Sequence, residues 1–364
     1  MTPRCRIAVL GLCLGLCLGL AAPAVAGELN VYYGTSRDLF EPVVQAFAAS
    51  RPDIKVSSYR APTEELMATI ELEIRAGKPR ADVIVITASQ LFGLQQQHKA
   101  LEPYSPKELE AVKKELRDPE GILNPVGVNL SLIQYNTKRI TGQDIPKKYA
   151  DLLNPKWNNQ IVITDPRSSS SAHTHIWFLT KYMADAGGEP PYGWTFYKEL
   201  RKLNAKYVAS HGTIRAMVQT GERPLGIQML NDAMKSITAG EPAAFVLAQE
   251  GSPAEITAAS LLKASRNQTE AKAFVDFLLT EKGQDLMVKV GGYVPVRTST
   301  AFKFPDGRGL ADFKAVPVDL AYITPAKREE HMQMFHEIMR CGERQRAAAG
   351  RIPRPGLPSG GRLL

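Results

Sequence analysis

The sequence predicts an α/β protein of two lobes, each a mostly parallel sheet covered by helices, joined by a two-strand hinge. Short apolar strands alternate with amphipathic helices, and residues 83–86 (VIVI) form an unbroken apolar run, typical of a parallel strand covered on both faces. The alternation begins again with different residues near position 161. Two extended stretches, residues 126–135 and 245–247, are expected to cross between the two units as the hinge.

The first unit opens with a short strand at residues 29–33, followed by a turn and a helix start at 34–38. Proline is tolerated in the first turn of a helix, so Pro42 is expected to lie in that turn. A strand at residues 54–59 and a further helix lead to the apolar strand at 83–86. The helix that contains Pro42 spaces its apolar residues by three to four positions, which predicts one buried face: Leu39, Phe40, Val43, Val44 and Phe47.

The second unit repeats the pattern of strand and helix three times. Its expected strands are short apolar or β-branched runs at residues 161–163, 206–208 and 225–227. A helix follows each of them. Further along the chain, residues 270–290 show the spacing of two short amphipathic helices.

Residues 1–26 have the organisation of a secretory signal peptide. Arg4 and Arg6 precede an apolar run that ends in Ala24-Val25-Ala26, a small-x-small cleavage pattern. The run is too short and wrongly flanked for a stable anchor, so export to the periplasm is expected, with a retained membrane helix as the alternative. Three of the four cysteines lie in this segment. The mature chain then keeps only Cys341 and forms no intramolecular disulfide.

Chain length and the order of elements predict the domain organisation. Lobe 1 is expected to comprise residues 27–128 plus 246–300, and lobe 2 residues 129–245 plus 301–341. Residues 342–364 are rich in Pro, Gly and Arg and lack apolar periodicity, so they are predicted to be a disordered basic tail. Most of the net charge of +8 lies at the two ends of the chain. A broad basic face for nucleic acid is therefore not expected.

Four consecutive serines, Ser168 to Ser171, stand between the expected strand at residues 161–163 and a helix. A strand that enters a helix through small hydroxyl residues leaves the first helical N–H groups free at the positive end of the helix dipole. Ser169, Ser170 and Ser171 are therefore predicted to bind a phosphate, carboxylate or other oxyanion. The alternative is plain N-capping, which one or two serines would satisfy.

Thr35 and Ser36 repeat this arrangement at the strand-to-helix turn of the first unit, with the same capping alternative. Open α/β sheets bind ligands outside the carboxyl ends of their strands, so two facing lobes are expected to enclose one anion between two helix ends. Asn231 and Asp232 follow the strand at residues 225–227 and are expected to bind the polar body of the ligand. Asp232 would accept from sugar hydroxyls or pair with an amine, and a helix cap is the alternative.

The remaining polar residues do not define a catalytic centre. His173 and His175 are two positions apart, on different faces of the expected helix, and are interpreted as solvated or core-lining residues. Glu64 and Glu65 are expected on the wet face of an amphipathic helix. The sequence contains no His-Glu-x-x-His helix, Gly-x-Ser-x-Gly elbow or Walker loop. No enzymatic activity, metal centre or cofactor is therefore expected.

Between Leu29 and Arg297 several stretches follow one another in an order typical of one family: LNVYYGTSRDLFEPVVQAFAASRP, KPRADVIVI, LIQYNTKRI, YADLLNPKWNNQIVITDPRSSSS and EAKAFVDFLLTEKGQDLMVKVGGYVPVR. In these stretches the chain resembles the extracellular solute-binding proteins of bacterial ABC importers, in the class of ferric-iron, phosphonate and sugar-phosphate binders. The resemblance implies a type 2 periplasmic-binding-protein fold that closes over a solute and docks on an inner-membrane permease with ATPase subunits. We expect a monomer whose partners are a small anionic solute and this permease, and not nucleic acid.

Ferric iron is the alternative solute. The resemblance to ferric binders implies a His in the first strand-helix turn, a Glu after the third strand and adjacent tyrosines in the second lobe. The chain has Ser36, Ala88 and the Asn231–Asp232 region there, and Ser36 and Ala88 cannot supply the anionic oxygen ligands that this hard cation needs. A small molecule bearing phosphate or phosphonate is therefore the expected solute. A secreted hydrolase and a sensory periplasmic protein are the alternatives of another class.

Overall fold

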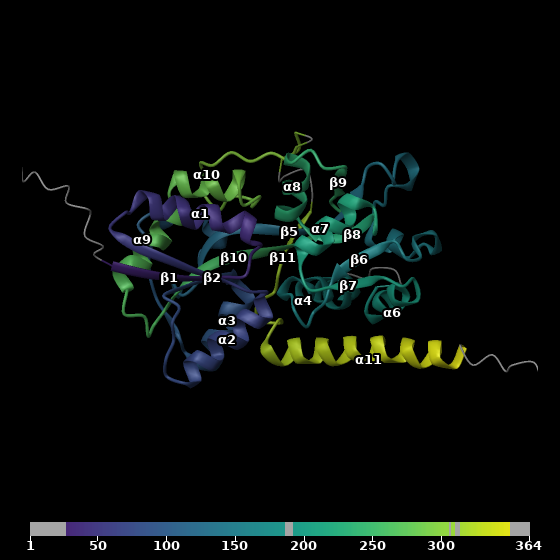
Figure 1. The fold of residues 1–364 in the computed structure, drawn as a ribbon, viewed down its shortest axis with the longest axis horizontal. Helices are drawn as coiled ribbons and strands as arrows, with labels where there is room; N and C mark the ends of the chain where they lie inside the picture. Colours follow the sequence, from purple (N-terminus) through teal and green to yellow (C-terminus); the bar gives the residue numbers. More distant parts are fainter. Residues whose placement is uncertain (1–26, 186–191, 306, 310–313, 350–364) are drawn as a thin grey trace, which may run out of the picture.

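A computed structural model describes residues 27–185, 192–305, 307–309 and 314–349 (Figure 1). The predicted signal peptide lies outside these residues. The strands are β1 (Gly27–Tyr33), β2 (Ile54–Arg60), β3 (Val83–Thr87), β4 (Leu101–Glu102), β5 (Asn124–Asn136), β6 (Ile161–Thr164), β7 (Lys206–Val208), β8 (Leu225–Met229), β9 (Ala243–Val246), β10 (Ser252–Leu262) and β11 (Ala315–Pro317). They form one curled sheet with the main order β2-β1-β3-β10-β5-β8-β6-β7.

Helices follow most of the strands. They are α1 (Arg37–Ser50), α2 (Thr63–Arg75), α3 (Ala88–His98), α4 (Ser170–Trp177), α5 (Met183–Asp185), α6 (Trp194–Lys202), α7 (His211–Thr220), α8 (Leu230–Thr238), α9 (Gln268–Leu279), α10 (Glu281–Lys289) and α11 (Pro325–Ala349). A π-helical turn, Phe178–Tyr182, joins α4 to α5. Short 3-10 turns lie at Leu109–Ala111, Lys114–Leu116, Gly142–Asp144, Tyr149–Leu153 and Pro155–Trp157. In the described part of the chain, no helix is long and apolar enough to cross a membrane.

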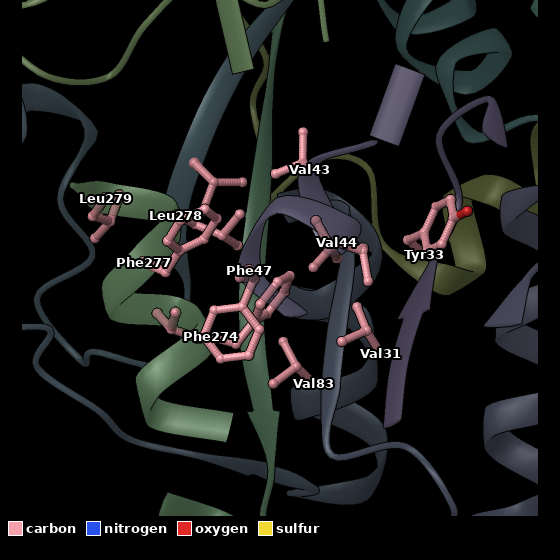
Figure 2. Packing of buried hydrophobic residues seen from close by; sticks show 14 of the residues in the cluster. Val31, Tyr33, Val43, Val44, Phe47, Val83, Phe274, Phe277, Leu278 and Leu279 are labelled. Atoms are coloured by element: carbon pink, nitrogen blue, oxygen red, sulfur yellow. The ribbon is translucent and has the colours of Figure 1, made fainter. Parts of the chain in front are cut away.

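The first lobe is built on β1, which has β2 and β3 parallel on its two sides. Helices α1 and α10 lie over one face of this sheet, and α2 and α3 lie over the other (Figure 1). The apolar face of α1 packs on β1, β3 and α9, where the rings of Phe47 and Phe274 have centroids 5.1 Å apart (Figure 2). The predicted buried face of α1 is confirmed for all its members: Leu39, Phe40, Val43, Val44 and Phe47.

Pro42 is the sixth residue of α1, so the expectation that it lies in the first turn is wrong. A proline inside a helix lacks the N–H that would bond the carbonyl four residues earlier, here that of Asp38. Lys235 of α8 occupies this position, with 3.4 Å between its Nζ and the carbonyl oxygen of Asp38. A side chain from the second lobe therefore takes the place of the missing helical bond.

The second lobe repeats this plan around β6, which has β7 and β8 parallel on its two sides. Helices α7 and α8 lie over one face of this sheet, and α4 and α6 lie over the other (Figure 1). The predicted strands at residues 161–163, 206–208 and 225–227 are confirmed as β6, β7 and β8. The two short helices expected within residues 270–290 are α9 and α10, which pack on the first lobe.

Two long strands, β5 and β10, connect the lobes and confirm the two-strand hinge. Residues 124–130 of β5 pair antiparallel with β10, whereas residues 131–136 pair with β8 and β9 of the second lobe. The prediction that residues 245–247 form the second crossing is wrong, because Phe245 and Val246 end β9, which pairs with β5 inside the second lobe. The true crossing, β10 (SPAEITAASLL), is rich in small residues, which give a weak strand signal.

Helix α11 continues to Ala349, so the prediction of a disordered tail is wrong for residues 342–349. Residues 350–364 lie outside the described part of the chain. The segment ERQRAAA at residues 343–349 consists of strong helix formers, which extend a helix without apolar periodicity. The residue boundaries of the two lobes stay predictions.

Candidate functional site

One cavity of about 80 Å³ lies between the two lobes, at the carboxyl ends of the parallel strands. A water molecule needs roughly 10–15 Å³ of such space, so the cavity takes a phosphate-sized group, and a larger solute requires the lobes to part. All seven residues that the sequence nominated lie in its wall: Thr35, Ser36, Ser169, Ser170, Ser171, Asn231 and Asp232. Segments far apart in the chain therefore meet at one place.

Six helices of the described chain begin at this cavity, each at the first turn after a strand or within a few residues of it. Their N-cap residues all line the wall: Ser36 (α1), Pro62 (α2), Thr87 (α3), Ser169 (α4), Ser210 (α7) and Met229 (α8). Each helix presents the positive end of its dipole and N–H groups that have no acceptor within the helix. Their convergence gives the cavity an electrostatic preference for an anion. The sequence analysis identified two of these six ends.

Plain N-capping does not explain the predicted serines. Ser36 and Ser169 stand at the N-cap positions of α1 and α4, yet neither side chain accepts a capping hydrogen bond. Ser210 of α7 does cap its helix, by accepting from the backbone N–H three residues on at 3.2 Å. Asn231 and Asp232 lie within the first turn of α8, beyond its N-cap residue. Asn231 Oδ1 accepts from the backbone N–H of Asp232 at 2.8 Å, so the capping alternative holds in part for Asn231.

Weak contacts join the two lobes across the cavity. Ser36 Oγ donates to Asp232 Oδ1 at 3.4 Å, and Thr87 Oγ1 donates to Ser170 Oγ at 3.5 Å. Both distances are at the outer limit of a hydrogen bond. A solute that offers better partners therefore replaces these contacts at little cost.

Three charged residues join the two lobes beside the cavity, next to the wall residue Asp232. Asp38 of α1 lies 2.6 Å from Lys235 Nζ and 2.8 Å from an Arg215 nitrogen, both through Oδ2. Burial alone would raise the pKa of Asp38, but the hydrogen bonds from Lys235 and Arg215 outweigh burial and lower that pKa. The carboxylate therefore stays ionised and holds α1 of the first lobe to α7 and α8 of the second.

The interior of the cavity contains charges of both signs. Arg60 of β2 lines it, together with the buried acids Asp232 of α8 and Glu255 of β10. Burial raises the pKa of Asp232 to about 6, with Arg215 opposing the rise. Burial also raises the pKa of Glu255 to about 7, with a hydrogen bond from Thr174 opposing it. Near neutral pH a fraction of each of these two carboxyl groups is therefore protonated. The protonated form donates a hydrogen bond, and the ionised form accepts one.

Behind the cavity, Arg328 of α11 binds the first lobe. Its guanidinium donates to Glu64 Oε1 of α2 at 3.0 Å and to Ser89 Oγ of α3 at 2.9 Å. Helix α11 also packs on α4 and α6 of the second lobe, so it bridges the lobes on this side (Figure 1). The expectation that Glu64 lies on a wet helix face is wrong, because its side chain is mostly buried and pairs with the buried Arg328.

His173 and His175 are buried on different faces of α4. His173 Nε2 lies 2.9 Å from the carbonyl oxygen of Pro166, and His175 Nδ1 lies 3.0 Å from Tyr197 Oη. The interpretation of both as core-lining residues is confirmed. Within the described ranges, no group of three or more His, Cys, Asp or Glu side chains is arranged to hold a metal ion.

The residues of the wall that were not nominated from the sequence include Arg60, Thr63, Thr87, Ser210, His211, Glu255, Thr257 and Tyr293. Thr63, Thr87 and Ser210 stand at strand-to-helix turns, so the strand-end rule applied to every strand would have found them. Glu255 lies in a hinge strand that the sequence did not reveal, and Tyr293 lies in a loop. The residues next to Glu255 and Tyr293 in the sequence form no pattern that would place either side chain at the cavity.

Comparison with known proteins agrees with this geometry. The model of the family described as bacterial extracellular solute-binding protein matches residues 78–313, so the chain belongs to that family. Among solved structures, the chain is similar to the periplasmic binding protein AfuA from Actinobacillus pleuropneumoniae with fructose-6-phosphate bound, with 26% identity and a TM-score of 0.75 over 86% of this chain and 99% of that chain.

Two curated relatives extend the comparison. An uncharacterized protein from Haemophilus influenzae is 28% identical over 284 residues, which cover 75% of this chain and 79% of the relative. The major ferric iron-binding protein from Neisseria meningitidis serogroup B is 23% identical over 308 residues, which cover 78% and 85%. The predicted family, the two-lobed type 2 fold and the role as solute-binding component of an ABC importer are thereby confirmed.

Proposed function

We propose that the protein captures a small molecule bearing a phosphate or phosphonate group and delivers it to an ABC permease. The convergence of six helix N-termini on one cavity carries this proposal. An oxyanion uses both of the features that these helix ends present: the positive dipole ends, and the N–H groups that no side chain already caps, as side chains do at α7 and α8. The similarity to a binding protein solved with fructose-6-phosphate supports the same solute class.

The anionic head group lies between the first turns of α1 and α4. Thr35 and Ser36 contribute hydroxyl groups from the first lobe, and Ser170 contributes one from the second. Arg60 adds a positive charge from β2. Hydrogen bonds to an ionised group contribute about 1.5–3 kcal/mol each, so a head group shared by both lobes favours the closed state.

The polar body of the solute faces the acids of the cavity. Asp232 and Glu255 accept hydrogen bonds from hydroxyl or ammonium groups, and Asn231 offers an amide at the start of the same helix. A bare inorganic anion leaves these acceptors without partners, at a cost for each unsatisfied group. A sugar phosphate or another organic phosphate or phosphonate satisfies both ends of the cavity.

The transport cycle follows from the hinge. The lobes open about β5 and β10, admit the solute, and close because the closed state alone makes contacts from both sides. The protein works in the periplasm as a monomer, after export by its signal peptide, and catalyses no reaction. The closed form docks on the permease, whose ATPase subunits drive import.

Ferric iron is the second candidate, since the relative from Neisseria meningitidis is named for it. Ferric iron needs several anionic oxygen ligands, whereas the converging helix ends repel a cation. Burial raises the pKa of both Asp232 and Glu255, which disfavours their charged forms. These observations favour the anion over the cation.

Mass spectrometry of the compound retained by protein purified without added solute tests this proposal, with iron measured in the same sample. An organic phosphate or phosphonate is expected. Calorimetric titration compares the affinity for fructose 6-phosphate with that for fructose, the matched compound without phosphate. The difference measures the contribution of the head group to binding. Stoichiometric iron without an organic phosphate contradicts the proposal, and steady release of inorganic phosphate would identify a hydrolase instead.

A further inference from the structure

His211, the first residue of α7, connects the serines of the cavity wall to the interior of the second lobe. Its Nδ1 lies 2.5 Å from Oε1 of Gln228, and its Nε2 lies 2.6 Å from Oγ of Ser171. A neutral imidazole donates from one nitrogen and accepts at the other. The nitrogen that carries the proton therefore decides whether Ser171 donates or accepts.

The amide of Gln228 determines this proton position. Its Oε1 accepts from the backbone N–H of Met229 at 2.9 Å, and its Nε2 donates to the carbonyl oxygen of His211 at 3.0 Å and to Oε1 of Gln134 at 3.3 Å. A flipped amide would place N–H against N–H and oxygen against oxygen at these contacts. Oε1 therefore faces His211, and Nδ1 must carry a proton to donate to it.

The direction of the next hydrogen bonds follows. With the proton on Nδ1, Nε2 of neutral His211 accepts, so Ser171 donates its hydroxyl proton to it. Ser169 Oγ lies 2.9 Å from Ser171 Oγ and must be the donor of that pair, because the proton of Ser171 is already used. Ser168 donates to the carbonyl oxygen of Asp165 at 3.1 Å. Ser168, Ser169 and Ser171 therefore donate their hydroxyl protons to other groups of the protein. Toward a solute their oxygens can only accept hydrogen bonds.

Ser170 differs from its neighbours. It is the acceptor in its 3.5 Å contact with Thr87, and no other described residue takes its hydroxyl proton. It is also the first residue of α4, where the backbone N–H groups have no helical acceptor. Ser170 and these amides therefore form the donor side of the wall, and Ser169 and Ser171 form its acceptor side.

The surroundings of His211 keep its imidazole neutral near pH 7. Burial lowers its pKa to about 4, although the hydrogen bond to Gln228 opposes the decrease. The charged groups that line the same cavity are Arg60 of β2, Asp232 of α8 and Glu255 of β10, and Arg215 lies one turn further along α7. Charges of both signs thus line the cavity to which His211 belongs.

We propose that His211 is a positioning residue that sets the hydrogen-bond direction of Ser169 and Ser171, so that the cavity selects a solute that donates hydrogen bonds to them while its anionic oxygens face Ser170. This inference rests on the proposed function and narrows its solute class to compounds with a protonated phosphate or phosphonate oxygen, or with a hydroxyl or ammonium group close to it. A fully ionised oxyanion without a donor meets two lone pairs and is rejected.

Two-bond ¹H–¹⁵N correlation spectra of the solute-free protein at neutral pH test the hydrogen-bond direction itself. The His211→Phe variant identifies the signals of His211. A neutral ring with the proton on Nδ1 and an unprotonated Nε2 is expected. A ring protonated on Nε2, alone or together with Nδ1, overturns the inference and leaves the proposed function intact.

Calorimetric titration with inorganic phosphate and with sulfate tests the consequence for selectivity. At about pH 6 phosphate carries protons, whereas sulfate carries none. The wild-type protein is expected to bind phosphate at least about tenfold more tightly than sulfate. Gln228→Glu places a carboxylate against Nδ1 and favours the imidazolium, whose Nε2–H frees Ser171 to donate. This variant is expected to reduce the preference for phosphate over sulfate to about threefold or less.

Two further variants complete the test. His211→Ala frees Ser171 without adding a charge and is expected to reduce the ratio in the same way. Gln134→Glu adds a buried carboxylate that does not touch His211, and it is expected to keep the ratio of the wild type. Equal affinity of the wild type for the two anions, or an unchanged ratio in both Gln228→Glu and His211→Ala, overturns the inference. If neither anion binds, the selectivity part of the inference fails, the spectra still decide the direction of the hydrogen bonds, and fructose 6-phosphate still tests the proposed function.

Discussion

Asp38 of α1 and Lys235 of α8 form an ion pair between the two lobes, with 2.6 Å between Oδ2 and Nζ. Lys235 also contacts the carbonyl oxygen of Asp38, which Pro42 leaves without a helical donor. The two residues belong to different lobes, so these contacts exist only while the lobes are closed. They therefore contribute to the free energy difference between the closed and the open state.

Asp38→Asn is expected to weaken solute binding by about threefold to tenfold, because partly exposed ion pairs contribute up to about 1 kcal/mol each. Calorimetric titration with fructose 6-phosphate measures this change. Asp285→Asn is the matched control, since Asp285 pairs with Lys289 at 2.7 Å on the exposed side of α10. An equal loss of affinity in both variants would show that closure does not depend on the ion pairs of Asp38.

Ser170→Ala is expected to lower the affinity for fructose 6-phosphate about tenfold, because it removes the hydroxyl donor of the cavity wall. The melting temperature of the empty protein should change by no more than a few degrees, since Ser170 caps no helix. Ser168→Ala serves for comparison, because its proton already bonds the carbonyl oxygen of Asp165. A larger loss of affinity in Ser168→Ala than in Ser170→Ala contradicts the assignment.

Glu255 is expected to make stability depend on pH. Burial raises its pKa from 4.5 to about 7, so between these values the folded protein holds a proton that the unfolded chain has lost. The free energy of unfolding should therefore fall as the pH rises through this window, by about 3 kcal/mol in all. Urea unfolding at several pH values measures the slope. Glu255→Gln stays neutral and should flatten the curve, and parallel curves for the two proteins would refute this origin.

Arg328→Leu is expected to lower the free energy of unfolding by about 2–3 kcal/mol, because it leaves the partly buried carboxylate of Glu64 without its counter-charge. The double variant Arg328→Leu with Glu64→Gln should recover part of the lost free energy of unfolding, because no uncompensated charge then remains at this pair. Lys327→Met is the control in the same turn of α11, where the ion pair with Glu330 is exposed. Denaturation of the three variants measures these differences, and no recovery in the double variant would contradict the ion-pair explanation.

The elements that were predicted correctly carry their own local signal. The apolar run of β3 and the spacing of the buried residues of α1 reflect the burial of those residues. Strand β10 escaped prediction, because Ala258 and Ala259 in it are small residues enclosed by neighbours on both sides. What makes residues 252–262 a strand is their pairing with β3 and β5, and this pairing is not visible in the residues of β10 themselves.

The residues of the site can also be separated into those that local sequence predicted and those that only the fold revealed. Ser36 and Ser170 were found because a small hydroxyl residue at a strand-to-helix turn is visible in the sequence. His211 was missed, because its position relative to Gln228 and Ser171 depends on three separate elements. Pro42 and Glu64 were misplaced for the same reason, since their compensating partners, Lys235 and Arg328, lie on distant helices.

The sequence by itself determined the alternation of strands and helices and two of the six helix ends at the cavity, because these follow from the chemistry of neighbouring residues. Its resemblance to known proteins indicated the family. Only the tertiary structure decided which strands cross between the lobes, which charges join the lobes, and which partners the serine hydroxyl groups have. Hydrogen-bond direction and ion pairing depend on the groups that face a side chain, and folding brings those groups together from segments that local patterns do not connect.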